Sequence, residues 1–168
     1  KAFTFKDNDT LIIGTVDGTS GVTTSASNIT ITLNGGTLTQ DPDAEFTGSG
    51  LELSVSGAVT LNAANDIDTL AADVTSANQA LEFTDADGFS VGSVGSIDGV
   101  STNGGAITLT STTNDITVTN VTGDDVDAGS GTVEINVNEL NALFQVNTSA
   151  LVTASGGVTI SADNVELD

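Results

Sequence analysis

The chain has 168 residues, of which 23 are Asp or Glu and only two are Lys or Arg, so its formal net charge at pH 7 is -21. A surface this acidic repels phosphate backbones and anionic lipid headgroups, which excludes nucleic acid as a partner. Hydrophobic residues make up 38% of the chain, too many for a disordered acidic tail, and no apolar run approaches the roughly 20 residues of a membrane-spanning helix.

Short strands are expected along the whole chain. In NITITL, residues 28–33, Ile29, Ile31 and Leu33 alternate with Thr, so one face of the strand is apolar and the other carries hydroxyls. The same alternation recurs at Ile107/Leu109, Ile116/Val118, Val133/Ile135/Val137 and Val158/Ile160. Clusters of Gly, Asn and Asp, which favour turns, separate these runs. Three segments leave a short helical turn open beside strand or loop, namely 63–64, 70–72 and 139–144.

A tandem repeat organises the chain. Residues 2–32 align without a gap on residues 80–110, with 12 identities in 31 pairs. Phe5 matches Phe83, and Ile31 is replaced conservatively by Leu109, which we expect to point inward. The strand spacing suits either an antiparallel sandwich or a parallel solenoid, but a unit recurring in register favours the solenoid.

We therefore predict an all-β fold, a parallel β-helix (β-solenoid) of about seven coils. Each coil would take roughly 20 to 26 residues, with three strands and three turns. Residues 1–168 form one solenoid segment, built from tandem units 2–79 and 80–168.

A family resemblance rests on the strings GSVGSIDGVSTNGGAITLTS at 92–111, its weaker copy at 14–33, and the openings GAVTLN at 57 and GGVTIS at 156. With these strings the chain resembles the repeat region of large bacterial surface proteins of the filamentous haemagglutinin type, including autotransporter adhesins. The resemblance implies a right-handed parallel β-helix that serves as an extracellular stalk or adhesive fibre. It implies no catalytic residues, and Lys6 and residues 41–50 depart from the pattern.

Three acidic turns are candidate sites for a hard cation. Oxygen ligands two residues apart in a turn can wrap Ca²⁺. The candidate ligands are Asp7, Asp9, Asp85, Asp87, Asp124, Asp125 and Asp127. The alternative is that Asp initiates turns through its side-chain hydrogen bonds and that solvated acid keeps the chain soluble. No complete EF-hand loop is present, so we expect no required cofactor, with calcium as the one candidate.

Catalysis is not expected. The chain has no His and no Cys, which removes the common general base, the thiolate nucleophile and the usual zinc ligands. A glycosidase needs only two carboxylates, which Asp85 with Asp87, or the acidic turn at 124–127, could supply. The absence of Arg, Trp and Tyr, which line most carbohydrate clefts, argues against this alternative.

The leading hypothesis is a structural module, a stiff acidic segment of an extracellular fibre or adhesin. The alternative is a carbohydrate- or ice-binding module, because outward Thr rows such as Thr108/Thr110 resemble ice-binding arrays. Neither end shows the polar cap that a solenoid needs, and the sequence stops partway through its own repeat. We expect end-to-end association, with a second copy or with flanking coils of a longer polypeptide. The expected contact residues are Lys1, Phe3, Phe5, Lys6, Asp163, Glu166 and Asp168.

Overall fold

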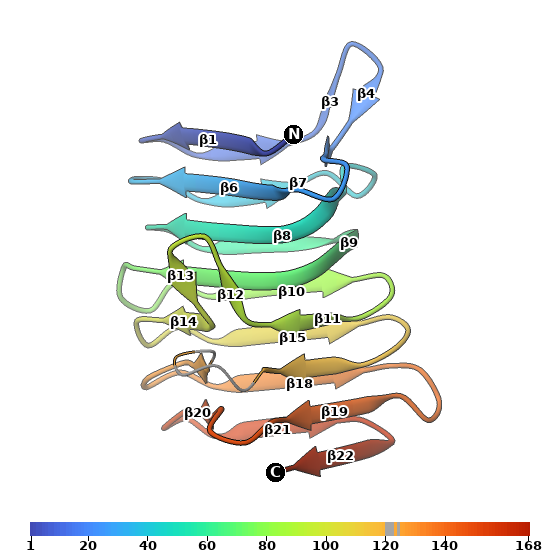
Figure 1. Ribbon diagram of the computed structural model, residues 1–168. Helices are drawn as coiled ribbons and strands as arrows, with labels where there is room; N and C mark the ends of the chain where they lie inside the picture. Colours follow the sequence, from blue (N-terminus) through green and yellow to red (C-terminus); the bar gives the residue numbers. More distant parts are fainter. Residues whose placement is uncertain (120–122, 124) are drawn as a thin grey trace.

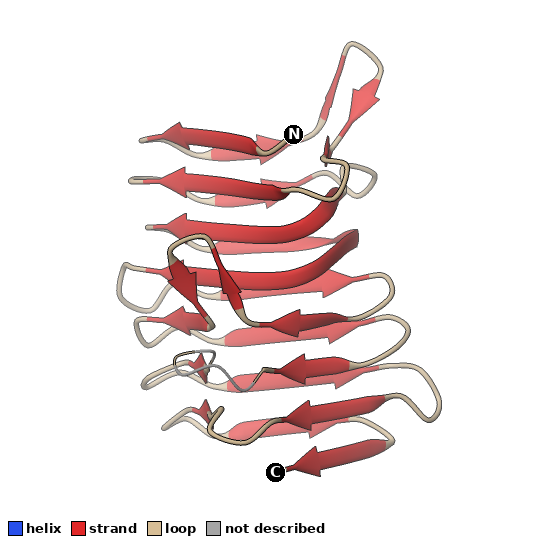
Figure 2. Ribbon diagram, viewed as in Figure 1, coloured by secondary structure: helices blue, strands red, loops and turns tan. Residues whose placement is uncertain are grey.

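The computed structural model describes residues 1–119, 123 and 125–168, and these residues form a β-solenoid of about six turns that contains no helix (Figures 1 and 2). In Figure 1 the near strands run from right to left and the distant strands from left to right while the chain descends, so the winding is right-handed. This handedness is the one that parallel crossovers almost always adopt. The predicted all-β parallel solenoid is confirmed. Within the described residues, no helix could cross a membrane.

The front face of the solenoid is a stack of parallel strands. Its members are β1 (Phe3–Asp7), β6 (Asn28–Leu33), the second half of β8 (Phe46–Val55), the second half of β9 (Val59–Val74), β11 (Phe89–Val91) with β14 (Val100–Thr102), β16 (Ile116–Val118) with β17 (Val126–Asp127), β19 (Leu143–Val146) with β20 (Val152–Thr153), and β22 (Asn164–Leu167).

The back face is a second parallel stack. It consists of β2 (Leu11–Ile13), β7 (Leu38–Gln40), the first half of β9, β10 (Leu81–Asp85), β15 (Ile107–Ser111), β18 (Val133–Val137) and β21 (Val158–Ser161). In the N-terminal half a short third side links the two faces, where β5 (Val22–Thr23) pairs with the start of β8.

The core lies between the two faces. Its inward side chains form columns that run along the axis, and each coil contributes one side chain to a column. One column on the front face is Phe3, Ile29, Leu51, Leu70, Val91, Val118, Val146 and Leu167. One column on the back face is Leu11, Leu38, Val59, Leu81, Ile107, Val133 and Val158. Leu109 is fully buried between Phe83 and Ile135, which confirms its predicted inward orientation.

Coil length varies more than the sequence predicted. A short coil runs from Leu51 to its paired residue Leu70, whereas a much longer one runs from Ile116 to Phe144. The longest coils carry insertions between their strands, and the structure has about six turns. Both alanine pairs considered as helical turns, 63–64 and 71–72, lie in β9, and residues 139–142 form a turn that leads into β19.

The two copies of the sequence repeat lie on opposite faces. Phe5 belongs to the front face, where it pairs with Ile31, whereas its sequence equivalent Phe83 belongs to the back face and pairs with Leu61 and Leu109. Three full coils separate Phe5 from Ala72 in the same column, and a further half coil leads to Phe83. Equivalent features of the two copies therefore project from opposite sides of the solenoid.

Each copy carries one antiparallel hairpin inserted into its coil. In the first copy β3 (Thr15–Val16) pairs with β4 (Thr19–Ser20), and in the second β12 (Ser93–Val94) pairs with β13 (Ile97–Asp98). Figure 1 shows that the first hairpin rises beyond the N-terminal coil, whereas the second folds back over the front face.

Candidate functional site

The acidic turns at 7–9 and 85–87 differ in burial. Asp85 ends β10 with its side chain in the core and is fully buried, whereas Asp7, Asp9 and Asp87 are exposed. A fully buried carboxylate offers no oxygen to a saccharide in solvent. Asp85 therefore lends no support to the glycosidase alternative.

Asp85 belongs to a polar column inside the core, where it pairs with Asn65 on one side and Ser111 on the other. Its carboxylate accepts hydrogen bonds from the backbone N–H of Ile67 (3.1 Å) and of Asp87 (3.2 Å). Burial raises the pKa of Asp85 to about 7; the two N–H donors oppose that rise, and the charge of Asp87 adds to it. Asp85 thus titrates near neutral pH.

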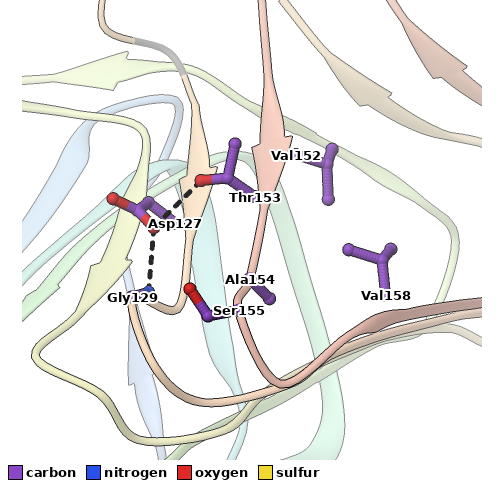
Figure 3. Close-up of a pocket in the computed structure, with 7 residues that line it drawn as sticks. All are labelled: Asp127, Gly129, Val152, Thr153, Ala154, Ser155 and Val158. Carbon is purple, nitrogen blue, oxygen red and sulfur yellow. Dashed lines mark hydrogen bonds between the residues drawn. The ribbon is translucent and has the colours of Figure 1, made fainter.

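The third acidic turn binds backbone and hydroxyl groups of its own chain. Asp127 Oδ1 accepts hydrogen bonds from the Gly129 N–H (2.8 Å) and the Thr153 hydroxyl (2.9 Å), as Figure 3 shows. Asp125 accepts from the Leu151 N–H at 2.8 Å. A bond from Asp to the N–H two residues later, made by both Asp85 and Asp127, defines an Asx turn. These contacts fit the turn interpretation of the acidic motifs.

The calcium hypothesis stays a prediction. Within residues 1–119, 123 and 125–168, no three Asp or Glu side chains gather into a group that could hold a metal ion. Asp124, the remaining candidate ligand, lies outside the described residues.

The C-terminal end of the core is open. A cavity of about 350 Å³ is lined there by Phe144, Val146, Ala150, Leu151, Val152, Val158, Ile160, Leu167 and Asp168. Leu167 is 69% exposed and Val158 is 41% exposed, although the inner members of both columns are buried. The shallower and more polar hollow of Figure 3 shares Val152 and Val158 with this end.

The N-terminal end is open as well. Phe3 is 36% exposed, and Phe5 and Leu11 are only partly covered. Among the described residues, no further strand pairs with the outer edges of β1 and β2, nor with those of β21 and β22 at the other end. Two apolar, unpaired ends therefore face in opposite directions along the axis (Figure 1).

The charged residues expected at the ends lie at those ends. Lys1 precedes β1 and Lys6 lies within it, and both are exposed; Glu166 lies within β22, and Asp163 and Asp168 flank it, all three exposed. Asp163 accepts a hydrogen bond from the Asn141 N–H at 3.1 Å. One chain does not bring the two groups together, since the length of the solenoid separates them (Figure 1).

The outward rows do not form a continuous Thr array. On the back face the column that contains Thr108 reads Ile12, Thr39, Thr60, Glu82, Thr108, Glu134 and Thr159. Glu82 and Glu134 interrupt the hydroxyls, so the regular spacing that an ice-like lattice requires is broken.

One contact of the second hairpin was not expected from sequence. Glu52, on the front face, accepts hydrogen bonds from the Ser96 N–H and the Ser96 hydroxyl, both at 2.8 Å, and from the Thr30 hydroxyl at 2.9 Å. Burial alone would raise the pKa of Glu52, but these three donors together lower it. The only sequence signal was an isolated acid in an outward strand position, which does not name its partner.

The chain matches no protein-family model, no curated protein and no solved structure.

Proposed function

We propose that the chain is a structural β-solenoid module that stacks end to end on a second copy of itself and so builds a fibre. One observation carries this proposal: inward columns on both faces run the whole length of the solenoid and end exposed at each end. The front column begins at Phe3 and ends at Leu167, and the back column begins at Leu11 and ends at Val158.

The two ends fit each other in strand direction. The last strands are β21 on the back and β22 on the front, and the first strands are β1 on the front and β2 on the back. A second copy placed head to tail sets β1 beside β22 and β2 beside β21, parallel in both cases. Leu167 then covers Phe3 and Val158 covers Leu11. Each such side chain contributes roughly 1.5–3 kcal/mol when it leaves water.

Phe5 fills the remaining space at this junction. Its column passes through Ile31, Leu53, Ala72, Val100 and Val126 and ends at Val152. In the described part of the chain no strand follows β20 in this column, and Val152 lines the open end cavity of about 350 Å³. The ring of Phe5 from the next copy enters that cavity, which explains why an aromatic side chain stands at the start of a column otherwise built of aliphatic residues.

Charge supports the same orientation. Ala2 stands one residue before Phe3 as Glu166 stands one residue before Leu167, so the junction sets Lys1 beside the acidic group of residues 163–168. The chain as a whole carries a net charge of -21, and copies repel each other until salt screens them. A contact of this head-to-tail kind does not close on itself and elongates into a fibre.

The setting we propose is the outside of a bacterial cell, in a stalk or adhesin. Its support is the resemblance of residues 92–111 and their copy at 14–33 to filamentous haemagglutinin-type repeats, together with the acidic, solenoid character of the chain. Ice binding has less support, since Glu82 and Glu134 break the Thr rows.

Engineered disulfides test the junction, because the chain has no Cys of its own. Adjacent strands lie about 4.8 Å apart, within the Cα separation that a disulfide spans. The variant Ala2→Cys with Glu166→Cys should oxidise to a ladder of covalent oligomers at moderate salt. The control pairs Ala2→Cys with Thr159→Cys, which is exposed on the other face of the same end.

Equal cross-linking of the two variants, or none in either, would overturn end-to-end stacking by this chain. A protein that sediments as a monomer at high concentration would overturn it as well.

A further inference from the structure

We infer that the hairpin β3–β4 is an intermolecular clasp that closes over the C-terminal coils of the stacked second copy. The inference rests on the stacking proposed above. The evidence is that the same structural element, repeated later in the chain, already performs this task within the molecule.

The two hairpins are built alike. Each is two short antiparallel strands, Thr15–Val16 with Thr19–Ser20 and Ser93–Val94 with Ile97–Asp98. Each is closed at its base by a glycine N–H bonded to a glycine carbonyl, Gly21 to Gly14 at 3.2 Å and Gly99 to Gly92 at 3.1 Å. Gly21 and Gly99 have nearly the same positive φ, 71° and 72°.

The second hairpin docks on coils that precede it. Val94 is 3% exposed and lies directly on Gly50, where an added Cβ would stand 2.9 Å from a Val94 methyl group. Gly50 lies two coils before Ser90, in the same column. The tip then donates to Glu52 through Ser96. The hairpin therefore ties three successive coils together.

The first hairpin has the same apolar residue, but its tip has no coil of the described chain beneath it. Val16, the equivalent of Val94, is 77% exposed. The base of the hairpin is anchored, because the Ser20 hydroxyl donates to the Asp43 carbonyl at 2.6 Å. The tip rises past the end of the solenoid (Figure 1), so the coils that it would cover are those stacked on β1 and β2.

Register identifies what it meets on the second copy. Ile12 is the equivalent of Ser90, and its column ends with Glu134 and Thr159. In the stacked pair Thr159 lies one coil before Ile12 and Glu134 lies two coils before it. Glu134 of the second copy thus takes the position that Gly50 has under Val94. Because Glu134 has the Cβ that Gly50 lacks, the first hairpin must stand farther from the sheet than the second one does, so that Val16 rests on the stem of that Glu.

Asn136 follows Glu134 by two residues, as Glu52 follows Gly50. Asn136 of the second copy therefore takes the position that Glu52 has under Ser96. Within one chain its side-chain amide donates to Glu134 at 3.1 Å, which orients the pair. Its amide oxygen accepts the N–H of Gly18, the equivalent of Ser96. The clasp thus adds an apolar contact and a hydrogen bond to the strand-edge junction, on the back face only.

Disulfide trapping tests the clasp. Val16→Cys with Glu134→Cys should give intermolecular cross-links, and Gly50→Cys with Val94→Cys should give the matching intramolecular bond that calibrates the geometry. Val16→Cys with Glu82→Cys is the matched control, because Glu82 is an exposed Glu in the same column but too far from the end to be reached. We expect the Glu134 pair to link at least about tenfold faster than the Glu82 pair.

A substitution supplies the second measurement. Val16→Asp should weaken end-to-end association at least about tenfold and leave the melting temperature of the monomer unchanged, because Val16 contacts little in one chain. Equal linking rates for the Glu134 and Glu82 pairs, or unaltered association of Val16→Asp, would overturn the clasp. If Ala2→Cys with Glu166→Cys still forms oligomers in that case, only the clasp is refuted and end-to-end stacking is retained. If that pair also fails to cross-link, the proposed stacking itself is refuted.

Discussion

Asp85 makes the stability of the solenoid depend on pH. Burial raises the pKa of its carboxyl from an ordinary 3.8 to about 7, so the folded state binds the proton more tightly than the unfolded chain does. The resulting stabilisation is fully present below about pH 4 and is lost as the pH rises through 7. This rise in pKa corresponds to a decrease of at most about 4 kcal/mol in the free energy of unfolding between low and high pH.

The substitution Asp85→Asn should remove this dependence. Asparagine keeps an oxygen that accepts the Ile67 N–H, but it carries no charge to desolvate. In thermal melts between pH 4 and pH 8 at fixed salt, the melting temperature of the variant should rise relative to that of the wild type as the pH rises. The difference should reach on the order of 10 °C at pH 8. Asp17→Asn, on the exposed tip of the first hairpin, controls for the loss of one negative charge. Parallel melting curves for wild type and Asp85→Asn would show that Asp85 does not titrate in this range.

Three further outcomes are expected. Leu109→Asp should cost several kcal/mol, because it places an unpaired charge between buried columns, whereas Thr108→Asp on the outer side of the same strand should shift melting little; equal losses would refute the register. Calcium binding at Asp85 and Asp87 predicts that chelation lowers the melting temperature and that the double Asn variant loses that response; melting that is unchanged between EDTA and millimolar Ca²⁺ at fixed ionic strength would leave the turn interpretation. Glu52→Gln should loosen the second hairpin, seen as faster hydrogen exchange at its tip, and acidification of the wild type should do the same, because the stabilisation from a lowered pKa is lost as pH falls; a tip that stays protected in both cases would show that Glu52 does not hold it.

The period-2 pattern predicted which side chains face the core. Alternation is a direct consequence of strand geometry, so Ile31 and Leu109 could be assigned inward positions without knowledge of the fold. The same rule left Asp85 unrecognised as a core residue. It ends a strand in an inward position, but an acidic residue before a turn is indistinguishable in sequence from a solvated one.

The placement of the two repeats on opposite faces could not be predicted. It depends on the lengths of the coils between them, which shorten progressively from Phe3 to Ile29, from Ile29 to Leu51 and from Leu51 to Leu70. The segment from Leu70 to Leu81, the equivalent of Phe3, then carries the chain from the front face to the back. Such lengths are set by how many residues each turn absorbs, and strand periodicity carries no information about turn length.

The hairpin that bonds to Glu52 also bears on how the solenoid responds to tension along its axis. The hydrogen bonds between coils lie along that axis, so a pull on the two ends peels coils off one at a time. A coil such as the one from Ile107 to Val133 lengthens the chain by about 90 Å when it is released. The contact between Ser96 and Glu52 joins residues 44 apart in sequence, so the coils that it spans yield together, in one step of about 150 Å. Stretching single molecules should therefore give a series of short extensions, each of about one coil. One longer extension, at a higher force, should interrupt the series when the coils in the middle of the chain unfold.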